Sequence, residues 1–352
     1  MRAATLHHLL DTRLPIIQAP MAGVQGAALA LATTNAGGLG SLPCATLAPA
    51  AMETELTHVT RDAHGPVNVN FFCHEPPVFD EARDDAWRAA LAPYFAEFGV
   101  DPQQIPRGPG RVPFNHDVAD ALEPFRPAVV SFHFGLPAPA LLERVRGWGA
   151  KILSTATTVD EARWLEARGV SGIIAQGFEA GGHRGMFLSD DLHGQLGTFA
   201  LLPQVVRAVR VPVIAAGGIA DPRGVAAAVT LGAAGVQVGT SYLLCPEVHT
   251  TPLHRRALRD ESRTALTAVT NLLTGRPARG MFNRVMRELG PMSPLAPTFP
   301  LATAAMTALR AAAEREQRDD FSSLWAGQNT TGCREVPAAE ITQALMDGVT
   351  LG

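Results

Sequence analysis

The sequence predicts an α/β protein built as one (β/α)8 (TIM) barrel with a helical C-terminal cap. Eight short apolar runs alternate with segments that show helical periodicity, and such alternation indicates a parallel sheet. Two of the last three spacings between the runs are only ~20 residues, enough for one crossover helix. The length of 352 residues suits a barrel of this kind as a single unit.

Each predicted strand is too short to be a helix and mostly ends in Gly, Pro, Ser or a polar residue. In chain order the eight runs are Pro15–Ala19, Leu39–Leu42, Val67–Phe72, Ala128–Phe132, Lys151–Ser154, Gly172–Ala175, Pro212–Ala215 and Gly235–Val238.

The segments between the later runs have 3.6-residue periodicity and contain good helix formers. Asp221 followed by Pro222 indicates a capped helix start, because Pro is well tolerated at the first helical position. The predicted helices include Thr158–Arg168, Leu201–Arg210 and Pro222–Leu231.

Two regions of the sequence are additional to the eight strand–helix units of a minimal barrel. We expect residues 1–245 to form the barrel, with an insertion at about 75–117 that is rich in Pro and aromatic residues. We expect residues 246–352 to form a mainly helical cap and a tail packed on the barrel. Helical patterns in this part cover Leu253–Leu272, Met281–Leu289 and Ala302–Arg318.

Composition narrows the possible functions. The net charge of −4 at pH 7 gives no sign of a nucleic-acid partner. The four cysteines are widely spaced, so neither a disulfide framework nor a metal site is expected. Lys151 is the only lysine and starts a strand, which argues against Schiff-base chemistry. The N-terminus lacks a signal-peptide pattern and no run suits a membrane span, so we expect a cytoplasmic protein.

Glycines cluster where the last two predicted barrel strands end. Gly217-Gly218 precedes the helix that starts at Pro222, and Gly239-Thr240 follows the eighth strand. Barrels commonly bind phosphate at this place through backbone N–H groups. The alternative is that these glycines only permit tight turns. Their occurrence at consecutive strand ends favours the phosphate site.

Amides dominate the other strand ends, namely Gln18, Asn70, Gln176 and Gln237. Uncharged donors and acceptors suit the pyrimidine edge of a flavin, although they would also suit simple capping of the strands. The small turn at residues 19–23 could lie flat against a ring system. No ring of carboxylates is present, which disfavours a magnesium-dependent site.

His183 is the strongest candidate for a catalytic base. It lies among Gly181, Gly182 and Gly185, an unusual place for a packing residue, and histidine can exchange protons near neutral pH. His133 is a weaker candidate, because it could face a bound ring or complete a hydrogen bond in the core.

These motifs together resemble class I nitronate monooxygenases. The resemblance covers about residues 14 to 290, and its most specific part is the string from Glu179 to Gly185. It is carried by Ala19-Pro20-Met21, by residues 36–40, by Asn70-Phe71-Phe72, by residues 131–135, by residues 176–185, by Gly217-Gly218 and by residues 237–240, with a further match at residues 324–328.

The resemblance implies non-covalent FMN at the barrel mouth and oxidation of nitronates or nitroalkanes by O2 to carbonyl compounds and nitrite. His183 would remove the α-proton of a neutral nitroalkane, a step that a preformed nitronate does not need. His133 and Phe299 are the substrate-pocket candidates. The implied cofactor contacts are Met21, Asn70, Gln176, Gly181, Gly217, Gly218, Gln237, Gly239 and Thr240.

One stretch departs from the family pattern. Class I members are similar in carrying tyrosines and a lysine that line the site from its C-terminal part. This chain has only two tyrosines, Tyr94 and Tyr242, and its corresponding stretch is Thr298–Thr307. A less polar mouth would favour a bulkier or different substrate. The expected partners are a small nitro compound and O2, with the protein a monomer or a homodimer.

Two alternatives remain open from the sequence. One is another FMN barrel, an NAD(P)H:quinone reductase or an enoyl-ACP reductase, although residues 131–135 favour the monooxygenase. The other is a barrel that binds flavin or a partner but catalyses no reaction. The presence of His183 in its glycine-rich loop argues against this second alternative.

Overall fold

Eight parallel strands form a closed barrel in the computed structural model, which describes residues 6–108 and 110–349. The sheet order is β1-β9-β8-β6-β5-β4-β3-β2, and a parallel bridge between Ile17 and Leu39 joins the two ends. All eight predicted strands are confirmed, with ends shifted by at most two residues. They are β1 Ile16–Gln18, β2 Gly40–Pro43, β3 Val67–Phe72, β4 Val129–His133, β5 Lys151–Ala156, β6 Gly172–Gln176, β8 Val213–Ala216 and β9 Gly235–Val238.

Alternation along β3 shows why these runs form barrel strands. Val67, Val69 and Phe71 pack outward against the helices. Asn68 and Asn70 point to the other side, where their amides donate to hydroxyls on the neighbouring strands β2 and β4. Successive side chains on a strand face opposite ways, so this strand supplies both the outer core and a polar layer inside the barrel.

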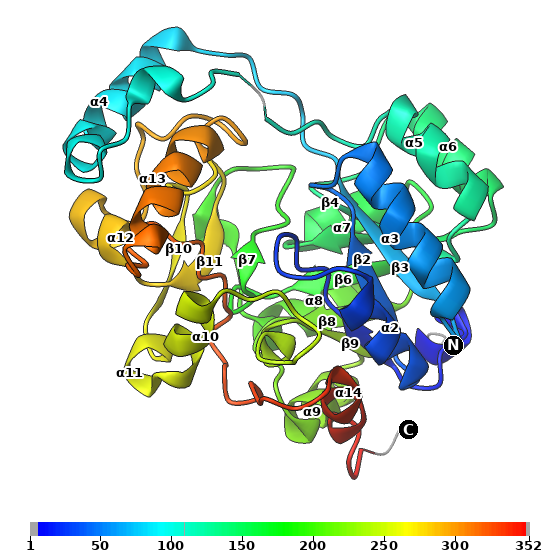
Figure 1. Cartoon of the computed structure of the whole chain (residues 1–352). Coiled ribbons are helices and arrows are strands. Elements are labelled where there is room, and N and C mark those ends of the chain that lie inside the picture. The colour runs from blue at the N-terminus through cyan, green and yellow to red at the C-terminus, as the bar shows by residue number, and fades with distance from the viewer. Residues whose placement is uncertain (1–5, 109, 350–352) are drawn as a thin grey trace.

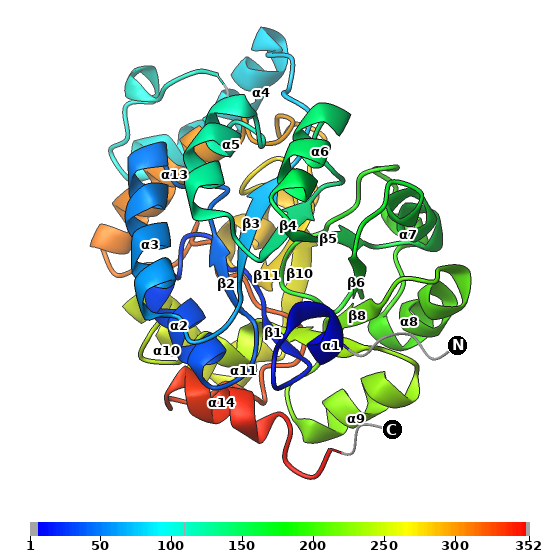
Figure 2. The same cartoon turned by 90° about the vertical axis from the view of Figure 1, so that its right-hand side faces the viewer.

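Helices cover the outside of the barrel (Figures 1 and 2). The predicted start at Asp221-Pro222 is confirmed, because the Asp221 carboxylate accepts from Gly224 N at 2.8 Å. The three predicted helices are α7, α8 and α9. The barrel helices are α2 Ala27–Asn35, α3 Pro49–Asp62, α5 His116–Leu122, α6 Pro139–Gly147, α7 Val159–Glu166, α8 Thr198–Ala208, α9 Pro222–Thr230 and α14 Ala338–Ala344; the 3-10 turns are η1 Pro102–Gln104, η2 Glu123–Phe125, η3 Leu192–Gly194 and η4 Thr240–Tyr242.

A short helix closes the end of the barrel where the strands begin. Leu6 and Leu10 of α1 (Leu6–Leu10) join a buried cluster with Ile17, Leu39 and Ile214 from the barrel interior. A plug of this kind leaves the opposite end, where the strands finish, as the place for chemistry.

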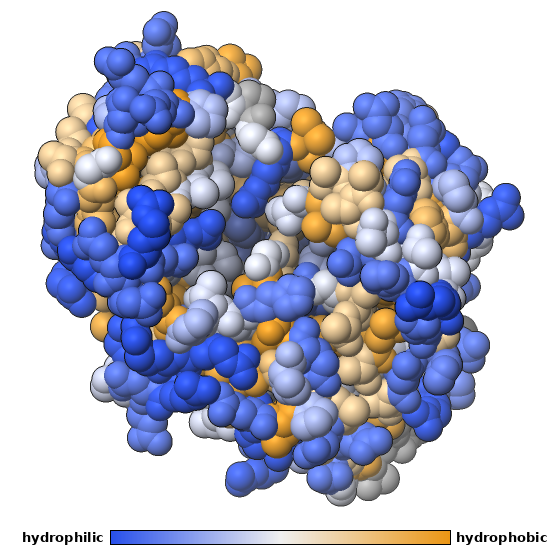
Figure 3. Space-filling model, in the orientation of Figure 1, coloured by the Kyte–Doolittle hydropathy of each residue, from blue (hydrophilic) through white to orange (hydrophobic). Residues whose placement is uncertain are grey.

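The insertion and the C-terminal region pack on each other beside the barrel mouth. Helix α4 (Glu81–Glu97) and α13 (Thr303–Arg315) share a buried cluster that includes Trp87 and Met306. Arg284 and Arg318 both form ion pairs with Glu97 of α4, at 2.8 and 2.9 Å. The other helices here are α10 Pro252–Arg259, α11 Glu261–Thr264 and α12 Arg284–Leu289. In Figure 3 a hollow separates this lobe from the helices α5 and α6 of the barrel.

The cap is less helical than the sequence predicted. The expected helix Leu253–Leu272 is wrong in its second half, where β10 (Thr267–Thr270) pairs antiparallel with β11 (Ala278–Met281). Strand β11 in turn pairs with β7 (Gly182–His183). Three of the four residues at 267–270 are β-branched and favour a strand, and pairing with β11, which also pairs with the histidine loop, stabilises it. No helix within the described residues combines the length and apolar character needed to cross a membrane.

Candidate active site

His183 lies in strand β7, at the point where the barrel loop meets the cap. Its backbone pairs with Ala278 of β11, and its Nε2 lies 2.9 Å from the hydroxyl of Thr274. Four aromatic rings surround the imidazole, with centroids at 5.4 to 6.1 Å. They belong to Phe72, Phe134, Phe299 and Trp325.

The surroundings of His183 keep its imidazole neutral. Burial lowers the pKa of His183 well below its usual 6.5, and the positive charge of Arg111 acts in the same direction. The Thr274 hydroxyl can donate to the carbonyl of Arg276 at 3.4 Å and, with the proton of His183 on Nε2, accept from that nitrogen. This tautomer leaves the lone pair on Nδ1, which makes no hydrogen bond within the described chain.

Both ring nitrogens of His133 form hydrogen bonds within the protein, and one of them supports His183. Its Nε2 lies 3.2 Å from the carbonyl of His183 and its Nδ1 lies 3.0 Å from the hydroxyl of Thr155. Burial lowers the pKa of His133 to about 3, so the ring is neutral. Of the two sequence hypotheses, the hydrogen-bonding one describes this geometry.

Gln176 fixes the same loop from the end of β6. Its amide Nε2 donates to the carbonyl of His183 at 2.9 Å, and its Oε1 accepts from Gly185 N at 2.8 Å. Arg184 is fully buried and donates to the carbonyls of Gly177 and Gln176 at 2.7 and 2.8 Å. The loop is therefore rigid around His183, and Arg184 is a structural group.

The predicted phosphate loops have the expected backbone. Gly217 and Gly218 have φ values of 111° and 74°, which side chains rarely adopt. Within the described chain, the N–H groups of Gly218, Gly239 and Thr240 donate no hydrogen bond. These three unused backbone donors lie at adjacent strand ends, on residues that are not fully buried, so a ligand can reach them and an anionic group would suit them.

A C-terminal segment, the tail strap (Leu324–Cys333), lies across these loops. Gly327 N donates to the Thr240 hydroxyl at 3.0 Å, and the Asn329 amide donates to the carbonyl of Gly218 at 2.9 Å. A Cβ atom at Gly181 would lie only 2.5 Å from Gly327 N. The tail strap thus holds three of the predicted cofactor residues in one place.

The remaining predicted cofactor residues line neighbouring strand ends. Met21 Sδ lies 3.7 Å from where a Cβ at Gly239 would stand. The amide of Asn70 donates to the Ser131 hydroxyl at 2.9 Å. The Oε1 atom of Gln237 is buried and has no hydrogen-bond partner within the described residues, as expected of an acceptor reserved for a ligand.

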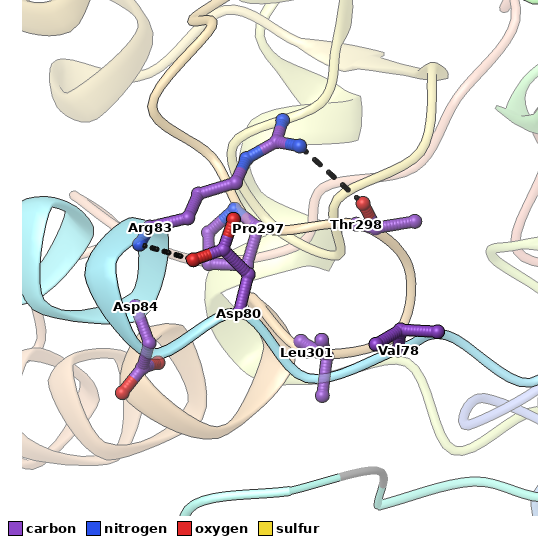
Figure 4. A pocket seen from close by; sticks show the side chains of 7 residues that line it. All are labelled: Val78, Asp80, Arg83, Asp84, Pro297, Thr298 and Leu301. Carbon is purple, nitrogen blue, oxygen red and sulfur yellow. Dashed lines mark hydrogen bonds between the residues drawn. The ribbon is translucent and has the colours of Figure 1, made fainter.

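Phe299 is one of the aromatic rings around His183, at a centroid distance of 5.4 Å. The same loop borders a pocket of about 250 Å³ on its outer side, shown in Figure 4. There Arg83 of α4 reaches Thr298 with a 3.4 Å hydrogen bond. The insertion therefore supports the loop that carries Phe299.

Three charged or titratable residues near His183 were not selected from the sequence. They are His74, Arg111 and Arg276. Arg276 follows Thr274 and places its Cζ 4.1 Å from the centre of the Phe134 ring. His74 follows the end of β3 by two residues, Arg111 lies in the insertion and Arg276 lies in the cap. The mouth is therefore more positively charged than the stretch Thr298–Thr307 suggested. Among the described residues, no cluster of His, Cys, Asp and Glu is arranged to hold a metal ion.

Comparison with known proteins identifies the family. A model of the nitronate monooxygenase family matches residues 3–348. The chain belongs to this family. A nitronate monooxygenase of Pseudomonas aeruginosa is 42% identical over 347 residues, which cover 96% of this chain and 97% of that protein. A second nitronate monooxygenase, from Paraburkholderia phytofirmans, is 42% identical over 348 residues, which cover 96% of this chain and 92% of that protein.

Solved structures agree with this membership. A nitroalkane oxidase from Streptomyces ansochromogenes superposes with a TM-score of 0.89 at 36% identity, covering 98% of this chain and 97% of that one. FabK from Thermotoga maritima reaches a TM-score of 0.70 at 25% identity, with 98% and 96% covered. The family is one of enzymes, so the chain is an oxidoreductase and the non-catalytic alternative is set aside.

Proposed function

We propose that this member of the nitronate monooxygenase family oxidises nitronates and nitroalkanes with O2, using FMN, to carbonyl compounds and nitrite. The observation that carries the proposal is His183: a neutral imidazole held by its backbone in a rigid loop, with Nδ1 unpaired and aromatic rings around it. The relatives named nitronate monooxygenase and nitroalkane oxidase support the reaction class.

The strand ends fit FMN. Gly218, Gly239 and Thr240 would bind the phosphate through their unused N–H groups. The orphaned Oε1 of Gln237 and the amide of Asn70 would meet the polar edge of the ring system. Met21, Gln176, Gly181 and Gly217 complete the set. When bound, the flavin supplies the electron-transfer chemistry, and the protein supplies position and exclusion of water.

His183 would accept the α-proton of a neutral nitroalkane. The C–H bond breaks, an N–H bond forms at Nδ1, and the electron pair moves onto the nitro oxygens to give the nitronate. The lowered pKa of His183 keeps the imidazole unprotonated at neutral pH, so the base form is present. Arg111 and Arg276 favour the negative charge that develops on the substrate.

The aromatic rings would keep water from the reacting carbon. Phe72, Phe134 and Phe299 contact one another at centroid distances of 5.0 to 6.3 Å. An apolar wall also strengthens the effect of the nearby charges, since the local dielectric is low.

An anaerobic spectrum of the purified protein tests the proposal. We expect a flavin band that changes when ethyl nitronate is added and does not change with NADPH. Rapid bleaching by NADPH without a response to the nitronate would instead support a reductase, the alternative that the similarity to FabK keeps in view. The absence of a flavin band would contradict the cofactor assignment.

His183→Asn tests the base. We expect turnover of neutral nitroethane to fall by roughly 100-fold or more, while turnover of ethyl nitronate stays within about threefold. Near-normal turnover of nitroethane by the variant, with its flavin content unchanged, would show that another group removes the proton.

A further inference from the structure

Side chains help to close the seam of the barrel, where β1 meets β2. Backbone hydrogen bonds join the two strands from Leu39 N to Ile16 O at 2.8 Å and from Gln18 N to Leu39 O at 2.9 Å. Beyond them, Ser41 bonds to two buried amides in place of backbone. Its N–H donates to Gln18 Oε1 at 3.0 Å, and its carbonyl accepts from Gln25 Nε2 at 2.6 Å. Amide side chains therefore complete the seam at the mouth of the barrel.

Gln25 also holds the loop that leaves β1, the first loop (residues 19–25). Its Oε1 accepts from Met21 N at 2.9 Å and from Gln18 Nε2 at 2.8 Å. Because Met21 N needs an acceptor and Ser41 O needs a donor, one orientation of the Gln25 amide satisfies both. The residue is buried and both of its amide atoms are paired. Gln25 is therefore fixed between the seam and the first loop.

Backbone hydrogen bonds hold the two ends of the first loop. Ala19 N donates to Val238 O at 2.8 Å, beside the glycine loop that follows β9, and Val24 O accepts from His249 N at 2.6 Å. The middle of the loop has a turn bond from Val24 N to Met21 O at 3.3 Å and the shorter bond from Met21 N to Gln25. Removing the Gln25 amide would therefore loosen the middle of the loop and leave its ends in place.

The middle of the first loop carries backbone donors that a ligand can reach. The N–H groups of Ala22 and Gly23 donate no hydrogen bond within the described residues, and neither residue is buried. A flavin gains negative charge on its ring system when it is reduced, and N–H donors in fixed positions stabilise such charge. The position of this loop therefore bears on both the binding and the reduction of the proposed cofactor.

We propose that Gln25 is a positioning residue that sets the affinity and the reduction potential of the flavin. It acts through Met21 N, and the first loop presents the N–H groups of Ala22 and Gly23 to the ring system. Without the amide these donors lose their fixed position, and the reduced flavin loses more stabilisation than the oxidised flavin does. This inference rests on the proposed cofactor, whereas the hydrogen bonds of Gln25 are those of the protein alone.

The test compares two Gln25 variants with a control at the other end of β2. Gln25→Met keeps the length of the side chain without the amide, and Gln25→Ala removes the same contacts if the thioether prevents folding. Thr34→Val is the control, because Thr34 is buried and its hydroxyl accepts from Gly40 N at 3.0 Å, away from the first loop. Titration of the flavin-free protein with FMN gives dissociation constants. Dye equilibration gives the midpoint potential of each holoenzyme, and amide hydrogen exchange follows residues 19–24.

We expect both Gln25 variants to bind oxidised FMN roughly 3- to 10-fold more weakly than the wild type, as for a lost hydrogen bond. The equilibrium constant for two-electron reduction should fall roughly 10-fold, which makes the midpoint potential about 30 mV more negative. Hydrogen exchange should become faster in residues 19–24 and stay unchanged around His183. Thr34→Val should lower the urea midpoint, while its FMN affinity and potential stay within about twofold of the wild type.

Two results would overturn the inference. One is an FMN affinity and a potential that match the wild type in both Gln25 variants. The other is an equal change in Thr34→Val, because reduced stability of β2 would then explain the effect without the first loop. A wild-type protein that binds no flavin would refute the proposed function and this inference with it. Bound flavin with unchanged constants in the Gln25 variants would refute this inference alone.

Discussion

Replacement of His133 by Phe separates support of the catalytic loop from direct chemistry. The variant keeps a flat ring against Phe72 and Phe134 but loses the 3.2 Å contact with the His183 carbonyl and the 3.0 Å contact with Thr155. Gln176 still donates to that carbonyl. The Thr155 hydroxyl loses its acceptor, so we expect the free energy of unfolding to fall by about 1–3 kcal/mol.

The kinetic consequence follows from the position of His183. With one of the two donors to its carbonyl lost, the backbone of His183 is held less tightly, and a small misplacement of a base lowers kcat strongly. We expect kcat for nitroethane to fall roughly 10- to 100-fold, with less than about threefold change for ethyl nitronate. His133→Gln should recover much of the rate, because its amide can donate to the same carbonyl.

Oxygen uptake with both substrates, together with urea unfolding and flavin content, checks these values. The pH profile between 6 and 8 should not move, since the pKa of His133 is about 3 and lies outside that range. Equal losses for nitroethane and its nitronate at full flavin content would refute the reasoning and place His133 in contact with the reacting molecule.

Two further predictions concern stability and cofactor retention. The pKa of His74 is about 4 in the folded state and near 6.5 in an unfolded chain. Between these values the unfolded state binds more protons than the folded state. The free energy of unfolding therefore falls as the pH drops from about 6.5 toward 4. Urea midpoints at pH 5 and 7 should therefore differ less in His74→Phe than in the wild type, and an identical difference would contradict the pKa assignment. Gly181→Ala places a Cβ 2.5 Å from Gly327 N, so we expect the tail strap to move and flavin to be lost on gel filtration. Gly147→Ala in α6, where a Cβ meets nothing within 4 Å, is the control, and equal flavin retention in both variants would show that the tail strap does not help to hold the cofactor.

The barrel could be predicted from sequence because its signals are local. Each strand is a short apolar run closed by a polar or glycine residue, and Asp221-Pro222 marks a helix start that depends on neighbouring atoms alone. The residues at strand ends, such as Gln176 and Gly218, follow from the rule that parallel strands finish at one edge.

The cap could not be predicted in the same way, because its structure depends on distant partners. Thr267–Thr270 carries β-branched residues, but it forms a strand only by pairing with β11, which is itself paired with β7. Arg111 has no special sequence setting, and His74 follows a strand end with no motif around it. Only their approach to Phe299 and His183 distinguishes them. Long-range contacts decide the structure and the role of residues at such positions.

The pairing of β7 with β11 has a consequence for how such proteins can diversify. The strand that carries His183 belongs to the barrel by chain connection and to the cap by hydrogen bonding. Recombination that exchanged the cap for a foreign one would leave the histidine loop without its partner strand, so the two halves must be inherited together. New substrates should then arise by point substitutions around the mouth, and not by swapping modules.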